Sequence, residues 1–194
     1  SHYLLTPGAL VRATTADDVA CAMTAARRHK VSLTFRSGGT SLSGQGLTDG
    51  IMVDTRRAFR GIEVLDEGRR VRVQPGATIR AVNTVLARYQ RKLGPDPASS
   101  VACTVGGVLA DNSSGMSCGT IANSYQTLES MVIVLASGTV LDTADPDADD
   151  KLTSTEPELV ETLLRLRETC RRPEHAERIR HLFSMKNTMG YGLN

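Results

Sequence analysis

Three loops rich in glycine, serine or proline interrupt the hydrophobic segments of this 194-residue chain, over residues 36–46, 94–100 and 104–119. Each loop follows the end of a predicted strand or helix. Glycine lets the backbone adopt positive φ angles and approach a ligand closely. The chain therefore has to fold so that these permissive loops lie at the ends of regular elements, where a ligand can reach their main chain.

The first loop, residues 36–46, has the composition of an anion-binding nest. It begins with the run RSGGTS over residues 36–41, directly after a predicted strand over 31–35. Consecutive N–H groups can point into one concavity that suits an anionic oxygen, and Arg36 adds a positive charge. We predict a phosphate or pyrophosphate site here, and a tight surface turn is the alternative. The spacing matches neither a P-loop nor the Rossmann fingerprint.

The other two loops are less specific when each is taken alone. In the second loop, residues 94–100, two prolines flank Asp96 and make a stiff, extended segment that could be only a connector. The third loop, residues 104–119, places Gly106 and Gly107 at the start of a short predicted helix. Unpaired N–H groups at such a start could bind an anion, and close helix packing is the alternative.

The elements around the loops predict an α+β fold in two lobes. A small α/β lobe over 1–57 carries the first loop, and a larger lobe over 58–194 has a mixed, mostly antiparallel sheet with flanking helices. Thr15 is predicted to cap the first helix. Helices are predicted over 16–29, 78–88, 106–112, 156–170 and 174–183, and strands over 31–35, 51–53, 61–65, 70–74, 131–135 and from 140. The apolar strand over 131–135 is predicted to be buried on both faces, and 145–150 to be an acidic loop.

Composition excludes several classes of function. The net charge is +2, the basic doublets are dispersed, and aromatic residues make up 4% with no Trp, which speaks against a nucleic-acid partner. No apolar run is long enough to span a membrane, and no signal peptide is visible. We expect a cytoplasmic protein, with peripheral membrane association as the alternative. The four cysteines form no metal or redox motif and are predicted to be free; no metal site is predicted.

Taken in order, the three loops resemble the FAD-binding (PCMH-type) domain of the vanillyl-alcohol oxidase / p-cresol methylhydroxylase superfamily. The chain is most similar to its FAD-linked D-2-hydroxy-acid dehydrogenases, which act on D-lactate, glycolate or D-2-hydroxyglutarate. The resemblance is carried by residues 36–41, 95–99, 104–115 and the strand over 131–138, and by the run Lys186-Asn187-x-x-Gly190-Tyr191.

The resemblance implies a role for each loop. The first loop would hold the FAD pyrophosphate, the second would lie along the flavin and ribityl chain, and the third would line the cofactor further. The strand around Ile133 would meet adenine through its backbone. The implied cofactor-binding residues are Arg36, Ser37, Gly38, Gly39, Thr40, Ser41, Pro95, Asp96, Pro97, Ala98, Ser99, Thr104, Gly106, Gly107, Asn112, Ser113, Gly115, Gly119 and Ile133.

The resemblance also implies how FAD is held. Members with a covalent flavin carry a histidine in the first loop, where this chain has Thr40. Bicovalent members add a cysteine, and Cys103 lies one position away from that place. We therefore expect non-covalent FAD.

The implied reaction is hydride transfer from the Cα of a D-2-hydroxy acid to flavin N5, with a quinone, a cytochrome or an iron–sulfur partner as electron acceptor. The substrate would be bound mainly by a cap domain absent from this chain, so no catalytic residue is assigned and the chain is expected to be inactive alone. The alternatives are an enolpyruvyl reductase, an alkyl-transfer flavoenzyme, or a phosphate-binding domain without redox activity.

Overall fold

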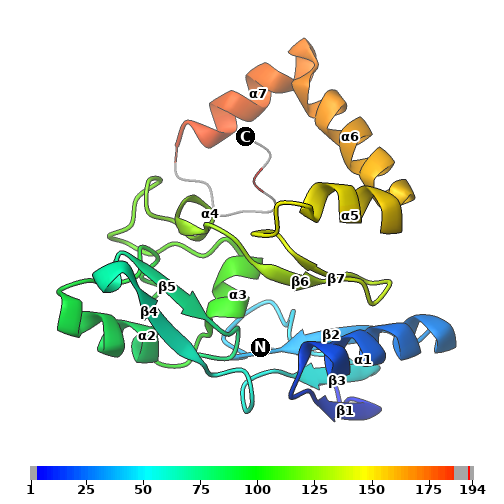
Figure 1. Cartoon of the computed structure of the whole chain (residues 1–194), viewed down its shortest axis with the longest axis horizontal. Coiled ribbons are helices and arrows are strands. Elements are labelled where there is room, and N and C mark those ends of the chain that lie inside the picture. Colours follow the sequence, from blue (N-terminus) through cyan, green and yellow to red (C-terminus); the bar gives the residue numbers. More distant parts are fainter. Residues whose placement is uncertain (1–3, 186–191, 193–194) are drawn as a thin grey trace.

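The computed structural model describes residues 4–185 and 192 of the chain, which form an α+β fold (Figure 1). The strands are β1 (Ala9–Arg12), β2 (Leu33–Arg36), β3 (Ile51–Asp54), β4 (Ile62–Leu65), β5 (Arg70–Val73), β6 (Val132–Val134) and β7 (Val140–Asp142). The helices are α1 (Ala16–His29), α2 (Ile79–Leu86), α3 (Val105–Ala110), α4 (Ser124–Thr127), α5 (Ala148–Thr155), α6 (Pro157–Arg171) and α7 (Pro173–Phe183). The predicted match over 186–191 lies outside the described residues.

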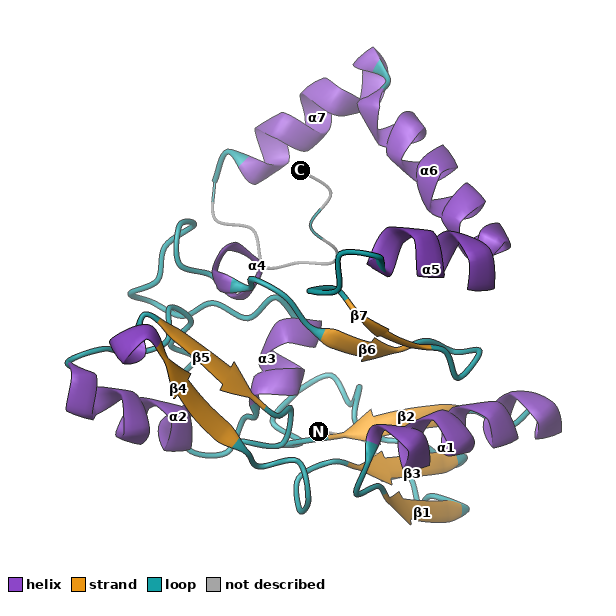
Figure 2. Ribbon diagram, in the orientation of Figure 1, coloured by secondary structure: helices purple, strands orange, loops and turns teal. Residues whose placement is uncertain are grey.

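A three-stranded parallel sheet in the order β1-β3-β2 carries the first loop. Helix α1 makes the crossover from β1 to β2 and packs beside the sheet (Figure 2). As predicted, α1 begins after Thr15, whose hydroxyl accepts from the Asp18 N–H while the Asp18 carboxylate accepts from the Thr15 N–H. Val53 on the central strand is fully buried against Val19 and Phe59. Leu33, at the start of β2, packs against this core, and the first loop leaves from the other end of the strand.

The larger sheet that was predicted for the second half is instead two separate antiparallel ladders, β4–β5 and β6–β7. Helix α2 buries Val82 and Leu86 against the inner face of β4–β5, where Val64 and Val71 point. Figure 2 shows α3 between the two ladders. No strand of one ladder pairs with a strand of the other among the described residues.

Two predictions for β6 and the segment after β7 are wrong. The apolar strand is not buried on both faces, since Met131 and Val132 are 42% and 59% exposed, and only Val134 packs against the first core. The acidic segment 145–150 is only partly a loop, because α5 begins at Ala148. Asp149 and Asp150 lie in its first turn, where they complement the helix dipole.

The last two helices were predicted to within one or two residues, and both begin with proline. Neither buries a residue, and they extend away from the sheets (Figure 1). Strand β1 and helices α4 and α5 were not predicted. The division into lobes at residue 57 stays a prediction; it falls between β3 and β4, although Phe59 packs into the first core.

Within the described part of the chain, no helix combines the length and the apolar character needed to cross a bilayer.

Candidate cofactor site

The first and third loops meet through both side chains and main chain. The Ser37 hydroxyl hydrogen-bonds the hydroxyl of Thr104, the residue that precedes α3. Gly38 lies directly on the main chain of the segment before Thr104, because a Cβ at this position would be 2.3 Å from the Ala102 carbonyl oxygen. A side chain at residue 38 would therefore push the loops apart, which explains the glycine.

Asp96 joins the second loop to the third. Its N–H donates to the Ser114 carbonyl (3.0 Å), and its carboxylate accepts from the Ser117 N–H (3.1 Å to Oδ2). Hydrogen bonds from Ser117, with the side chain as the largest contribution, hold the pKa of Asp96 below its usual value. A Cβ on Gly115 would be 2.0 Å from Asp96 Oδ1. Asp96 therefore shapes the site through contacts within the chain.

The first loop presents free N–H groups. None of the main-chain N–H groups from Ser37 to Gly46 donates to another atom of residues 4–185. Gly39 and Gly44 have positive φ angles of 65° and 83°, as a nest requires. A run of unpaired N–H donors at the carboxyl end of a parallel strand suits an anionic oxygen, and the contact with the FAD pyrophosphate stays a prediction.

The acid beside Arg36 in the parallel ladder is already paired. Asp54 is the ladder partner of Arg36, but it binds Arg56 through two oxygens (3.1 Å to Nε and 2.9 Å to Nη2). The hydrogen bond to Arg56 lowers the pKa of Asp54 despite its burial. No carboxylate of the described residues forms an ion pair with Arg36. The charge of Arg36 is therefore not neutralised by its ladder partner.

The start of α3 decides between the two alternatives at Gly106 in favour of close packing. The Gly106 N–H is not free, because it donates to the Pro75 carbonyl (3.0 Å), and the Val105 N–H donates to Ala77 (2.9 Å). A Cβ on Gly106 would be 2.6 Å from Pro75 Cβ, so this glycine permits close packing. Of the predicted pair, only the Gly107 N–H lacks an acceptor among the described residues. Cofactor contact at both positions stays a prediction.

Other predicted residues of the third loop also have contacts within the chain. Asn112, with a positive φ of 45°, accepts from the Tyr125 N–H through Oδ1 (3.1 Å) and so positions α4. The Ser113 hydroxyl donates to Asp111 (2.9 Å). Gly119 has a φ of 57° and open space around it.

In the second loop, Pro95 is buried, Ala98 is exposed, and the Ser99 carbonyl accepts two N–H groups.

The β6–β7 ladder determines which backbone groups of β6 are available for the predicted adenine contact. The Leu135 N–H donates to the Thr139 carbonyl, and the Thr143 N–H donates to the Met131 carbonyl. Hydrogen-bonded pairs alternate along an antiparallel strand, so Ile133, two residues from each, also directs its N–H and C=O groups toward β7. The groups that face the open edge belong to Val132 and Val134. The adenine contact at Ile133 stays a prediction, and the ladder geometry favours the backbone groups of Val132 and Val134 for that contact.

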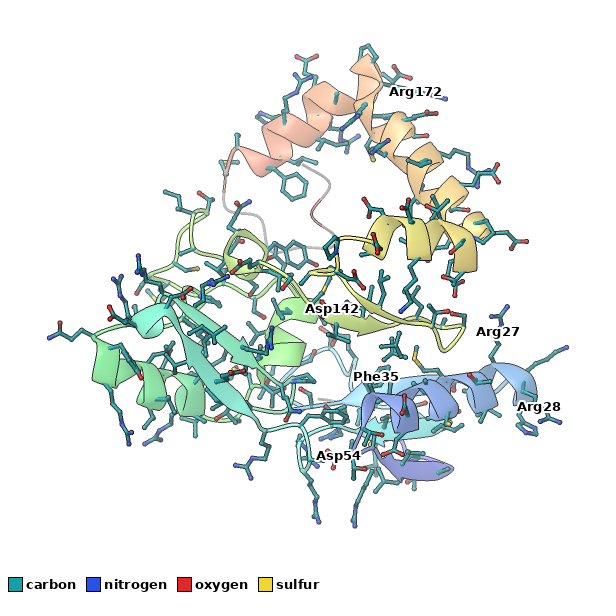
Figure 3. All side chains as sticks on the ribbon, viewed as in Figure 1. Arg27, Arg28, Phe35, Asp54, Asp142 and Arg172 are labelled. Carbon is teal, nitrogen blue, oxygen red and sulfur yellow. The ribbon has the colours of Figure 1, made fainter. Side chains whose placement is uncertain are left out.

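Sequence reasoning did not find Ala102, Ser114 or Ser117, which complete the contacts between the loops. Ala102 and Ser114 act through their carbonyl oxygens, so their residue type carries little signal, whereas Ser117 also contributes its side chain. Two shallow hollows of about 350 and 310 Å³ lie beside α1, away from the three loops. Figure 3 shows Phe35, one residue before Arg36, between the first sheet and the β6–β7 region.

Comparison with known proteins agrees with this geometry. A family model described as an FAD binding domain matches residues 7–144. The glycolate oxidase subunit GlcD of Escherichia coli K12 is 32% identical over 120 residues, which cover 61% of this chain and 24% of the relative. D-2-hydroxyglutarate dehydrogenase of Pseudomonas putida is 40% identical over 119 residues, which cover 59% of this chain and 12% of the relative. The chain thus spans a quarter or less of these relatives.

Solved structures show the same fold. 6-Hydroxy-D-nicotine oxidase from Arthrobacter nicotinovorans aligns with a TM-score of 0.66 at 22% identity, over 81% of this chain and 33% of the oxidase. A chitooligosaccharide oxidase aligns with a TM-score of 0.60 at 21% identity, over 76% of this chain and 32% of that protein.

Proposed function

Since the chain belongs to the FAD binding domain family, of the PCMH type, we propose that it is the cofactor-binding part of a longer FAD-linked oxidoreductase acting on a small D-2-hydroxy acid. The observation that carries this proposal is the run of free N–H groups over residues 37–46, held against Thr104 and the third loop. Relatives named for glycolate, D-2-hydroxyglutarate and D-lactate support the substrate class, because all three are 2-hydroxy acids.

The residues of the chain would bind and orient the cofactor. The N–H groups of the first loop bind the pyrophosphate, and the second and third loops, joined by Asp96, lie along the rest of the molecule. The flavin, when bound, accepts a hydride from the substrate Cα. Thr40 offers no ring nitrogen for a flavin bond, so FAD is held non-covalently. Substrate groups and the contact with an electron acceptor lie in the remainder of the longer protein.

The first test is an absorbance spectrum of the purified chain with excess FAD removed, recorded before and after acid precipitation. We expect flavin bands that move entirely to the supernatant, because no covalent link forms. The reducing substrate is tested on the full-length protein: D-lactate, glycolate or D-2-hydroxyglutarate should bleach the flavin bands, and L-lactate should not. A full-length protein that binds no FAD would refute the proposal. Flavin that stays with the precipitate would refute the non-covalent part.

A further inference from the structure

The Arg36 side chain begins from a fixed point at the end of β2. Its Cα pairs with Asp54 across the parallel ladder, and its carbonyl accepts from the Thr55 N–H (3.3 Å). The ladder therefore determines the position of the backbone from which this side chain extends.

From that point the guanidinium reaches across its own loop. Nη1 donates to the Gly46 carbonyl (3.2 Å), ten residues further along the chain. On Gly39, a Cβ would be 2.8 Å from Nη2, 3.0 Å from Cζ and 3.3 Å from Nε of the same guanidinium. These three similar distances show the guanidinium lying against the Gly39 main chain. The loop thus closes around the Arg36 side chain.

Besides the contacts of Ser37 and Gly38 with the segment over 102–104, few hydrogen bonds within the loop maintain its shape. Its internal hydrogen bonds among the described residues, besides that of Arg36, are Leu47 N–H to the Gly44 carbonyl (3.0 Å) and the Ser41 hydroxyl to Gln45. Asp54, the acid nearest in the ladder, is bound to Arg56. Arg36 is therefore the side chain that connects the start of the loop to its end.

We propose that Arg36 is a positioning residue that braces the first loop, and that the affinity of the loop for the pyrophosphate depends on the planar fork of its guanidinium more than on its charge. The proposal rests on the proposed FAD function. A lysine keeps the charge, but its single ammonium cannot both donate to Gly46 and lie flat on Gly39. The role differs from direct neutralisation of the phosphates, for which any cation would serve in part.

The test compares Arg36→Lys with Arg36→Gln, using FAD and riboflavin, which lacks the pyrophosphate, as probes. We expect both variants to weaken FAD binding by about tenfold to a hundredfold and to leave riboflavin binding unchanged. The salt dependence of FAD binding should be the same for Arg36→Gln as for the wild type. The proposal is overturned if Arg36→Lys keeps the wild-type affinity, or if Arg36→Gln reduces the salt dependence.

A double-mutant cycle tests the contact with Gly39. Gly39→Ala places a methyl group against the guanidinium, and Arg36→Gln removes the group that it meets. The two effects on FAD affinity should therefore be far from additive; additive effects would contradict the contact.

Backbone order parameters from NMR relaxation separate this proposal from the function on which it rests. In flavin-free protein, Arg36→Gln should lower the order parameters over residues 37–46, whereas Arg57→Gln, at an exposed arginine outside the loop, should not. If the wild type binds no FAD, the proposed function fails and the order parameters still test the brace. Unchanged order parameters in Arg36→Gln would overturn the brace even if FAD binds.

Discussion

The three loops, residues 36–46, 94–100 and 104–119, and the last two helices, α6 and α7, are held in place by different contacts. The loops are joined by contacts between residues far apart in the sequence, such as Ser37 with Thr104 and Asp96 with Ser117. Helices α6 and α7 bury no residue, and Leu163 and Leu166 of α6 are half exposed. The family match also ends at residue 144, before α5 begins. Contacts between distant residues therefore constrain the loops, and few such contacts constrain α6 and α7.

The two regions differ in how much free space surrounds each residue for an added or altered side chain. At Gly38 and Gly115 a single added methyl group would meet the main chain of another loop. Along α6 the side chains border solvent, and the helix depends on local features such as Pro157 in its first turn. Substitutions should therefore have large effects in the first region and small effects in the second.

The largest expected effect is that of Gly115→Ala. Its φ is 151°, and the new Cβ would lie 2.0 Å from Asp96 Oδ1 and 2.4 Å from the Asp96 carbonyl oxygen. We expect a loss of about 3 kcal/mol or more in the free energy of unfolding, measured with urea. The matched control is Gly119→Ala, which also has positive φ but no atom within 4 Å. It should cost only about 1–2 kcal/mol; equal losses would show that the contact with Asp96 is not tight.

A smaller effect is expected when apolar side chains are shortened in the two regions. Val53→Ala removes two methyl groups from a fully buried position of the first core and should lower the free energy of unfolding by about 2–3 kcal/mol. Leu163→Ala on α6 removes more atoms but from a side chain that is half exposed, and should cost less than about 1 kcal/mol. A larger loss at Leu163 than at Val53 would reverse the comparison.

The smallest effect concerns pH and the pair of Asp54 with Arg56. Because Arg56 lowers the folded-state pKa of Asp54, the pair stabilises the fold above the unfolded-state pKa, near 4. This contribution is lost as the pH falls through the folded-state pKa. Arg56 is half exposed, which screens the pair. Unfolding curves between about pH 6 and 2 should show a shallower acid dependence in Asp54→Asn than in Asp49→Asn; identical curves would contradict the assignment.

The sequence predicted local features well and distant contacts poorly. Helix α1 was predictable because Thr15 and Asp18 form a capping box within one turn, and the loops were predictable from composition. The bond between Ser37 and Thr104 joins residues 67 positions apart, and no periodicity encodes it.

An open alternative and an error have the same physical origin. Gly106 could offer a free N–H or permit close packing, and the second holds because Pro75, from a distant turn, accepts its N–H. The run from 131 to 135 was predicted to be a strand buried on both faces, but β6 pairs only with β7 among the described strands and leaves Val132 exposed. In both cases the partner, and not the residue itself, decides the outcome.

The first loop has a consequence for how proteins of this kind diverge. Its donors are main-chain N–H groups, which every residue except proline supplies, so side chains such as that of Leu42, 81% exposed, can change without removing a donor. Selection on such a loop acts on backbone shape, through the few positions where glycine or Arg36 is required. We therefore expect relatives with different substrates to share this loop while their differences in specificity accumulate elsewhere in the protein.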